Sequence, residues 1–185
     1  MHTRDTALII VDAQESFRHR PFWSDTDVPA FVEHVQSLHD GARTRGIPIV
    51  QVFHVADEGV FSPGSGLVTS LSPLVIDPDI VFHKKRHSAL LGTSLDAWLT
   101  KNGIRRLIIC GIRTEQCCET TARHAFDCGY LVDYVTEATL TFAMTDRHGH
   151  TWSPSDIKAR TELVLSRRFA RITTVAETLL GPGAM

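Results

Sequence analysis

Short apolar runs alternate with amphipathic segments along the whole chain, and this alternation constrains the fold more than any other feature. The run 7–11 (ALIIV) is apolar at every position, as expected for a strand buried on both faces of a parallel sheet. The next segment, 28–45, carries apolar residues at helical spacing, with Pro29 in its first turn and Gly46 after its end. A strand followed by a helix is the unit that builds a parallel sheet covered by helices.

The same unit recurs toward the C-terminus. Loops are predicted at 54–78 and 141–153, and connections of this length are usually functional. We therefore predict an α/β, Rossmann-like, three-layer αβα fold with a mostly parallel six-stranded sheet. The further strands are expected at 47–53, 80–82, 105–110, 130–135 and 171–175, and the further helices at 93–102, 114–128, 156–169 and the end of the chain.

Composition and charge exclude several other classes. The chain has 185 residues, 43% hydrophobic and 22% charged, which is typical of a globular protein and not of a disordered or collagen-like one. With 19 Lys and Arg against 21 Asp and Glu, the net charge of −2 gives no reason to expect nucleic acid or an anionic membrane as a partner. No apolar run approaches the roughly 20 residues of a membrane helix, and the N-terminus lacks a signal-peptide layout, so we expect a cytoplasmic protein.

Polar residues that directly follow the predicted strands are the candidates for chemistry, because the carboxyl ends of parallel strands share one edge of the sheet. Asp12 follows the first strand, where a partly solvated carboxyl group is a candidate general base with a raised pKa. The alternative is an ordinary strand-end aspartate. The run 84–86 (KKR) follows the strand at 80–82, and either one of its lysines points inward or the run is a solvated face.

Cys117 is the candidate nucleophile. Gly111 turns the chain after the fourth strand, Thr114 is a candidate N-cap, and Cys117 then lies in the first helical turn. The free N–H groups and the helix dipole favour a thiolate at that position, so we expect a lowered thiol pKa. The alternative is a buried structural cysteine. All four cysteines fall between Cys110 and Cys128, which favours reduced thiols over a disulfide scaffold.

No metal site is predicted. His148 and His150 form an isolated His-x-His in a polar loop, which is more often solvated than metal-bound. His54 and Asp57 follow the second strand, but no further ligand stands at the spacing of a metal site.

Three segments, in this order along the chain, resemble the motifs of the isochorismatase-like cysteine hydrolases, a superfamily that includes nicotinamidases and N-carbamoylsarcosine amidohydrolase. The segment 12–17 (DAQESF) resembles D-x-Q-x-x-F, 84–90 (KKRHSAL) resembles K-x-R-x-S-A-F, and 111–122 (GIRTEQCCETTA) resembles G-V-x-T-x-x-C-V-x-x-T-A. The resemblance covers nearly the whole chain, and it implies a single hydrolase domain over 1–185 that acts on a small molecule without a cofactor.

The resemblance also assigns the triad. It implies that Cys117 is the nucleophile, Asp12 the base and later the acid, and Lys84 the third member, in a hydrolase that cleaves an amide-type C–N bond through a thioester. It implies a cis peptide bond between Ile112 and Arg113, with the N–H groups of Arg113 and Cys117 as oxyanion donors.

Other implications of the resemblance concern substrate and assembly. Phe17 and Gln14 are expected to contact the substrate, and a homo-oligomer, dimeric or larger, is expected. The segment 53–57 (FHVAD) departs from the D-x-H metal motif of nicotinamidases, so a metal site of that kind is not expected. Two alternatives stay open: a vinyl ether hydrolase of the isochorismatase type that uses Asp12 as an acid, and a non-catalytic binding protein. The Arg113 side chain either binds a carboxylate or faces solvent.

Overall fold

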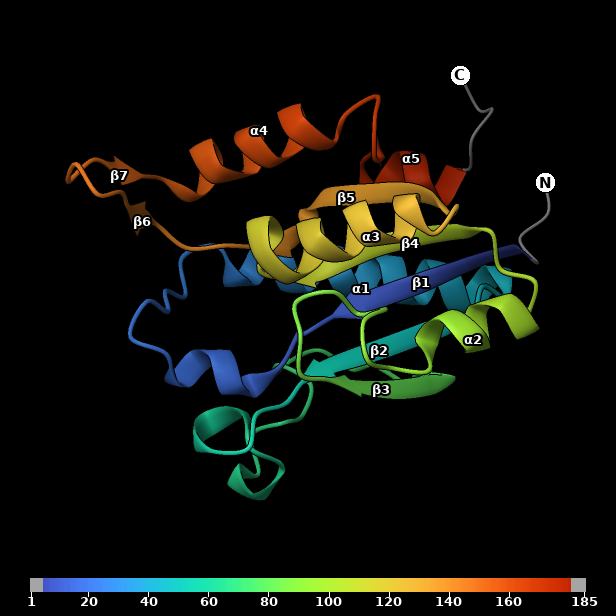
Figure 1. Ribbon diagram of the computed structural model, residues 1–185, viewed down its shortest axis with the longest axis horizontal. Coiled ribbons are helices and arrows are strands. Elements are labelled where there is room, and N and C mark those ends of the chain that lie inside the picture. Colours follow the sequence, from blue (N-terminus) through green and yellow to red (C-terminus); the bar gives the residue numbers. More distant parts are fainter. Residues whose placement is uncertain (1–4, 181–185) are drawn as a thin grey trace.

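A six-stranded sheet in which all neighbouring strands are parallel forms the centre of the molecule (Figure 1). The computed structural model describes residues 5–180. The strand order β3-β2-β1-β4-β5-β8 confirms the predicted parallel six-stranded sheet. The strands are β1 (Thr6–Val11), β2 (Ile49–His54), β3 (Ile80–Lys84), β4 (Arg106–Ile112), β5 (Leu131–Leu140) and β8 (Arg171–Ile172).

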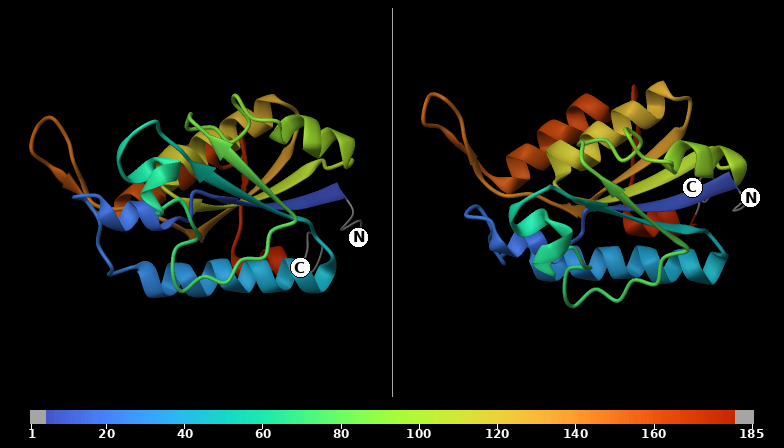
Figure 2. Two further views of the ribbon diagram at one scale, coloured as in Figure 1. Left: turned by 90° about the horizontal axis from the view of Figure 1, so that it is seen from below. Right: turned by 60° about the horizontal axis from the view of Figure 1, so that its bottom comes forward.

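Helices cover both faces of this sheet, which confirms the three layers (Figure 2). Because side chains alternate along a strand, Leu8 and Ile10 of β1 pack in one apolar cluster with Phe31, whereas Ile9 packs in the other with Ala122. The first face is covered by α1 (Val28–Arg45) and α5 (Val175–Leu180), and the second by α2 (Leu95–Lys101), α3 (Glu119–Asp127) and α4 (Pro154–Leu165). None of the described helices is both long enough and apolar enough to cross a bilayer.

The region around β4 and β5 differs from the prediction in two ways. The helix predicted over 114–128 begins instead as a π-helical turn, Thr114–Cys118, and continues as α3. The strand predicted over 130–135 extends to Leu140, because the register between β4 and β5 shifts after Ile109 and pairing resumes at Gly111. This bulge lets β5 run alongside the end of β4, next to the turn that carries Cys117.

The loop predicted over 141–153 contains a small antiparallel hairpin, β6 (Met144–Thr145) and β7 (Thr151–Trp152). The Asp146 carboxylate closes its turn by accepting hydrogen bonds from the backbone N–H groups of His148 and His150, at 2.8 and 3.1 Å. His148 and His150 thus belong to a polar turn.

Gly111 allows β4 to approach the end of β1. Its φ of +128° lies in a region that side chains rarely adopt, and a Cβ atom built on Gly111 would lie 1.8 Å from the carbonyl oxygen of Val11. Val11 is the last residue of β1, and Asp12 follows it. Because Gly111 has no side chain, the end of β4 can lie directly against the end of β1. This close contact sets the distance between the segment that leads to Asp12 and the one that leads to Cys117.

We predict that Gly111→Ala lowers the free energy of unfolding by about 3 kcal/mol or more, because the added methyl group overlaps the β1 backbone. Gly103→Ala is the matched control: its φ is also positive, +68°, but no atom lies within 4 Å of the added Cβ. The control should lose only about 1 kcal/mol. Urea denaturation of both variants checks this, and equal losses would contradict the proposed clash.

Candidate active site

The ammonium group of Lys84 lies at the centre of the three residues predicted to form a triad. Its Nζ is 2.7 Å from Asp12 Oδ2 and 3.3 Å from Cys117 Sγ. The side chains of Asp12 and Lys84 are fully buried, and Cys117 is 7% exposed. The structure therefore brings together three side chains that are far apart in the sequence.

Each of these residues is positioned by the end of a strand. Asp12 directly follows β1 and adopts a left-handed φ of 50°, with its N–H donating to Val52 O at 2.8 Å. Lys84 is the last residue of β3. Cys117 lies in the π-helical turn after β4, where the carbonyl of Arg113 accepts the N–H groups of Gln116 and Cys118. The cis peptide bond expected between Ile112 and Arg113 is present.

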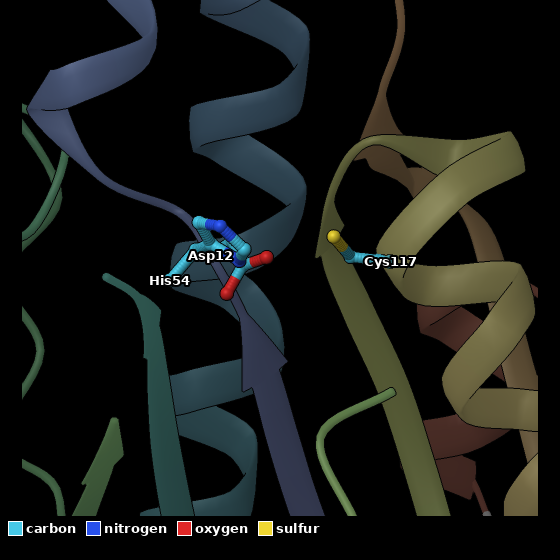
Figure 3. Close-up of side chains that lie close together, drawn as sticks. All are labelled: Asp12, His54 and Cys117. Carbon is cyan, nitrogen blue, oxygen red and sulfur yellow. The ribbon is translucent and has the colours of Figure 1, made fainter. Parts of the chain in front are cut away.

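His54 is a fourth member of the site that the sequence analysis considered only as a metal ligand. Its Nδ1 lies 3.3 Å from Lys84 Nζ (its proximity to Asp12 is seen in Figure 3). Burial and then the charge of Lys84 lower the pKa of His54 to about 4, so the ring is neutral at physiological pH. A neutral ring facing an ammonium donor accepts through Nδ1, which assigns the proton to Nε2. His54 ends β2 at the same sheet edge as Asp12, so its position after the second strand was evident in the sequence, but its contact with Lys84 was not.

Gln14 makes hydrogen bonds to the backbone of this histidine. Its Oε1 accepts the His54 N–H at 2.8 Å, and its Nε2 donates to His54 O at 3.1 Å and to Ser16 Oγ at 2.9 Å. Gln14 is fully buried and does not line the cavity described below. The amide of Gln14 is thus engaged by His54 and Ser16 within the protein, and the substrate contact expected of Gln14 stays a prediction.

The charges of the triad differ from the sequence-based expectation in one respect. Burial raises the pKa of Asp12 against the opposing effect of Lys84. Burial by itself lowers the pKa of Lys84, but Asp12 and Cys117 more than offset it, and the ammonium is retained. Burial and the Asp12 carboxylate raise the pKa of Cys117 well above its usual range. The expectation of a lowered thiol pKa is thus wrong for the resting site, because these two effects outweigh that of the helix terminus.

The Asp12 carboxylate retains one free oxygen. Within residues 5–180, no hydrogen-bond partner reaches Asp12 Oδ1, although this atom is buried. The carboxylate and the Cys117 sulfur approach within 4.8 Å of one another, and Figure 3 shows them facing each other across the ends of β1 and β4. The Asp12 carboxylate therefore has an unused acceptor oxygen and lies in the neighbourhood of the thiol.

The ligand atoms of Asp12, His54 and Cys117 lie close enough together to hold a metal ion. The Lys84 ammonium, however, contacts all three side chains, with Nζ no more than 3.3 Å from each. A metal ion at the same position would meet this positive charge. The residues therefore fit an ammonium-centred site, and a metal ion does not enter the chemistry proposed below.

A cavity of about 260 Å³ opens in front of the triad. Of these three residues, Cys117 lines the cavity, whereas the buried Asp12 and Lys84 do not. Phe17 and Arg113 line it as well, and Phe61, from the predicted functional loop, packs edge-to-face on Phe17 at 5.1 Å. The complete lining consists of Phe17, Arg20, Phe22, His54, Phe61, His87, Arg113, Gln116 and Cys117.

Comparisons with known proteins give one consistent result. The family model of the isochorismatase domain matches residues 6–177. The chain is 26% identical over 178 residues to the uncharacterized isochorismatase family protein YrdC of Bacillus subtilis, covering 94% of both chains. It is 27% identical over 157 residues to Nicotinamidase 3 of Arabidopsis thaliana, covering 76% of both. A crystal structure of a putative hydrolase of the isochorismatase family from Chromobacterium violaceum superposes with a TM-score of 0.88 at 25% identity, covering 97% of this chain and 94% of that one.

We predict that Asp12→Asn lowers the thiol pKa of Cys117, because the variant removes a neighbouring negative charge that raises this pKa. The pH dependence of Cys117 alkylation by iodoacetamide, located by peptide mapping, reports this pKa. Asp57→Asn is the matched control, since Asp57 is exposed and pairs with Lys85. An unchanged or higher Cys117 pKa in Asp12→Asn would show that the carboxylate does not act on the thiol.

Proposed function

Because the chain belongs to the isochorismatase family of hydrolases, we propose that it cleaves the C–N bond of a small amide through a thioester on Cys117. One observation carries the proposal: a single buried ammonium, that of Lys84, lies within hydrogen-bond distance of both Asp12 Oδ2 and Cys117 Sγ. A relative named as a nicotinamidase supports an amide substrate. The cavity of about 260 Å³ in front of Cys117 suits a small molecule.

In the first half-reaction, Asp12 takes the thiol proton on Oδ1, which is free to accept it. The Cys117 sulfur attacks the carbonyl carbon, and the carbonyl oxygen becomes an oxyanion. We assign its hydrogen bonds to the backbone N–H groups of Arg113 and Cys117, and this is supported by both residues lining the cavity. Asp12 then returns the proton to the leaving nitrogen, the C–N bond breaks, and the amine or ammonia departs.

In the second half-reaction, water attacks the thioester carbonyl while Asp12 accepts one of its protons. The second tetrahedral intermediate collapses, the C–S bond breaks, and the proton on Asp12 returns to the sulfur. The products are a carboxylic acid and the amine, and the enzyme regains its starting protonation state. Lys84 stays positively charged throughout and stabilises the negative charge wherever it lies.

We predict that Cys117→Ala lowers kcat for amide hydrolysis by at least about 10³-fold, since it removes the nucleophile. A panel of small amides, read out by ammonia or amine release, supplies the measurement. Cys118→Ala is the matched control, because Cys118 is a fully buried neighbour that does not line the cavity, and it should retain turnover. Acid quenching during turnover should trap an acyl adduct on Cys117 that mass spectrometry detects.

Each alternative function has its own signature in this experiment. Turnover of a vinyl ether that survives Cys117→Ala but not Asp12→Ala would replace the covalent mechanism with acid catalysis by Asp12, whose raised pKa suits an acid. A protein that turns over no substrate of the panel, and whose Cys117 forms no acyl adduct, would be a binding protein on the same scaffold.

A further inference from the structure

His54 belongs both to the cavity wall and to the cluster around the triad. It lines the cavity together with Cys117, and one of its ring nitrogens lies within 4.8 Å of the Cys117 sulfur and of an Asp12 carboxylate oxygen (Figure 3). His87, the other histidine of the lining, is not part of this cluster among the described residues. Asp12 itself is buried and does not line the cavity. A molecule in the cavity therefore meets the cluster at His54 and at Cys117.

The ring of His54 is held in one orientation. Its Nδ1 faces Lys84 Nζ at 3.3 Å, and the ring of Phe61 packs perpendicular to it, with the two ring centroids 5.6 Å apart. The side chain of Gln14 binds the backbone N–H and the carbonyl oxygen of His54. Because Nδ1 faces Lys84, the second ring nitrogen, Nε2, points away from the ammonium.

Nε2 of His54 is an unused hydrogen-bond donor. It carries the proton of the neutral ring, since Nδ1 accepts from Lys84. No atom of the described residues accepts a hydrogen bond from it, yet Nε2 is not among their buried atoms that lack a partner, in contrast to Asp12 Oδ1. Nε2 is therefore accessible to solvent, and His54 offers one N–H of fixed direction to a molecule in the cavity.

The second half-reaction uses a donor of this kind. When water attacks a thioester, one lone pair of the water oxygen bonds to the carbonyl carbon while a base takes a proton. The other lone pair can accept a hydrogen bond, and a donor that fills it fixes the orientation of the water. Such a donor has to lie beside both Asp12 and the acylated sulfur. His54 meets this condition, because its ring is grouped with the Asp12 carboxylate and the Cys117 sulfur.

We propose that the N–H of His54 Nε2 holds the water molecule that hydrolyses the thioester. The water enters after the leaving amine has departed and accepts a hydrogen bond from Nε2. Its oxygen then bonds to the carbonyl carbon, and one of its protons passes to the Asp12 carboxylate. No proton passes through His54, so the ring keeps the same tautomer throughout. This inference rests on the proposed function and assigns a further catalytic residue to its second half-reaction.

The ester p-nitrophenyl acetate separates the two half-reactions without a known amide substrate. p-Nitrophenolate leaves without being protonated, so acetylation of the thiol is fast, and product release shows a burst followed by a slower steady rate. The burst rate measures acetylation, and the steady rate measures hydrolysis of the acetyl thioester. Peptide mapping by mass spectrometry locates the acetyl group and separates Cys117 from the exposed Cys128.

We expect His54→Asn to lower the steady rate by about tenfold or more and to leave the burst rate within about twofold of the wild type, because it removes one hydrogen bond from deacylation alone. Asparagine still offers Lys84 an acceptor near the position of Nδ1 but has no donor at that of Nε2. His54→Gln, whose amide N–H can reach the position of Nε2, should recover part of the steady rate. His83→Asn is the matched control, because His83 is exposed and does not line the cavity, and it should change neither rate.

Two outcomes would overturn this inference while the thioester stands. An unchanged steady rate in His54→Asn would show that the water does not need this donor. An equal fall of the burst and steady rates would show that His54 supports the triad as a whole and has no separate part in deacylation. A wild-type protein that forms no acetyl adduct on Cys117 is a different result, since it contradicts the covalent mechanism itself and this inference with it.

Discussion

The buried ion pair between Asp12 and Lys84 is the interaction on which the rest of the site depends. Both side chains are fully buried, and removing two charges from water costs several kcal/mol for each. Their contact at 2.7 Å offsets this cost only because Lys84 finds further acceptors, among them the carbonyl of Arg86 at 3.0 Å. β1 and β3 are not neighbours in the sheet, so the pair spans the end of β2 and ties three strand ends together.

The residues around the ion pair stabilise the contact between Asp12 and Lys84. A protonated His54 would place a second positive charge next to Lys84, and burial prevents this by lowering the histidine pKa to about 4. Gln14 fixes the backbone of His54 from both its N–H and its carbonyl side. On the other flank, Gly111 brings β4 against β1 where a Cβ atom would not fit. The arrangement of the site thus depends on the neutral His54 ring and on the glycine at position 111 as much as on its charged groups.

The sequence predicted the framework well because the framework follows from local patterns. The apolar runs identified the six strands, and the position after each strand identified Asp12, the run 84–86 and the turn before Cys117. The choice of Lys84 within that run came from the resemblance to the family motif. Sequence could not predict the sign of the change in the Cys117 pKa, because this depends on burial and on the distance to Asp12, which only the fold determines. The same holds for the hydrogen bonds of the Gln14 amide to the His54 backbone, which only the fold determines.

The number of acceptors around Lys84 explains how such a site can move a proton at little electrostatic cost. An ammonium group has three N–H donors, and four acceptor atoms lie within 3.3 Å of Nζ: Asp12 Oδ2, Arg86 O, His54 Nδ1 and Cys117 Sγ. In the proposed mechanism, the thiol proton moves to Asp12. The carboxylate, a strong hydrogen-bond acceptor, becomes a weakly accepting carboxylic acid, and the sulfur becomes a strongly accepting thiolate. The donors of Lys84 can then shift toward the sulfur while its nitrogen stays in place, and the net charge of the three groups is the same before and after. A buried site in which no net charge is created avoids most of the desolvation penalty that a lone thiolate would carry.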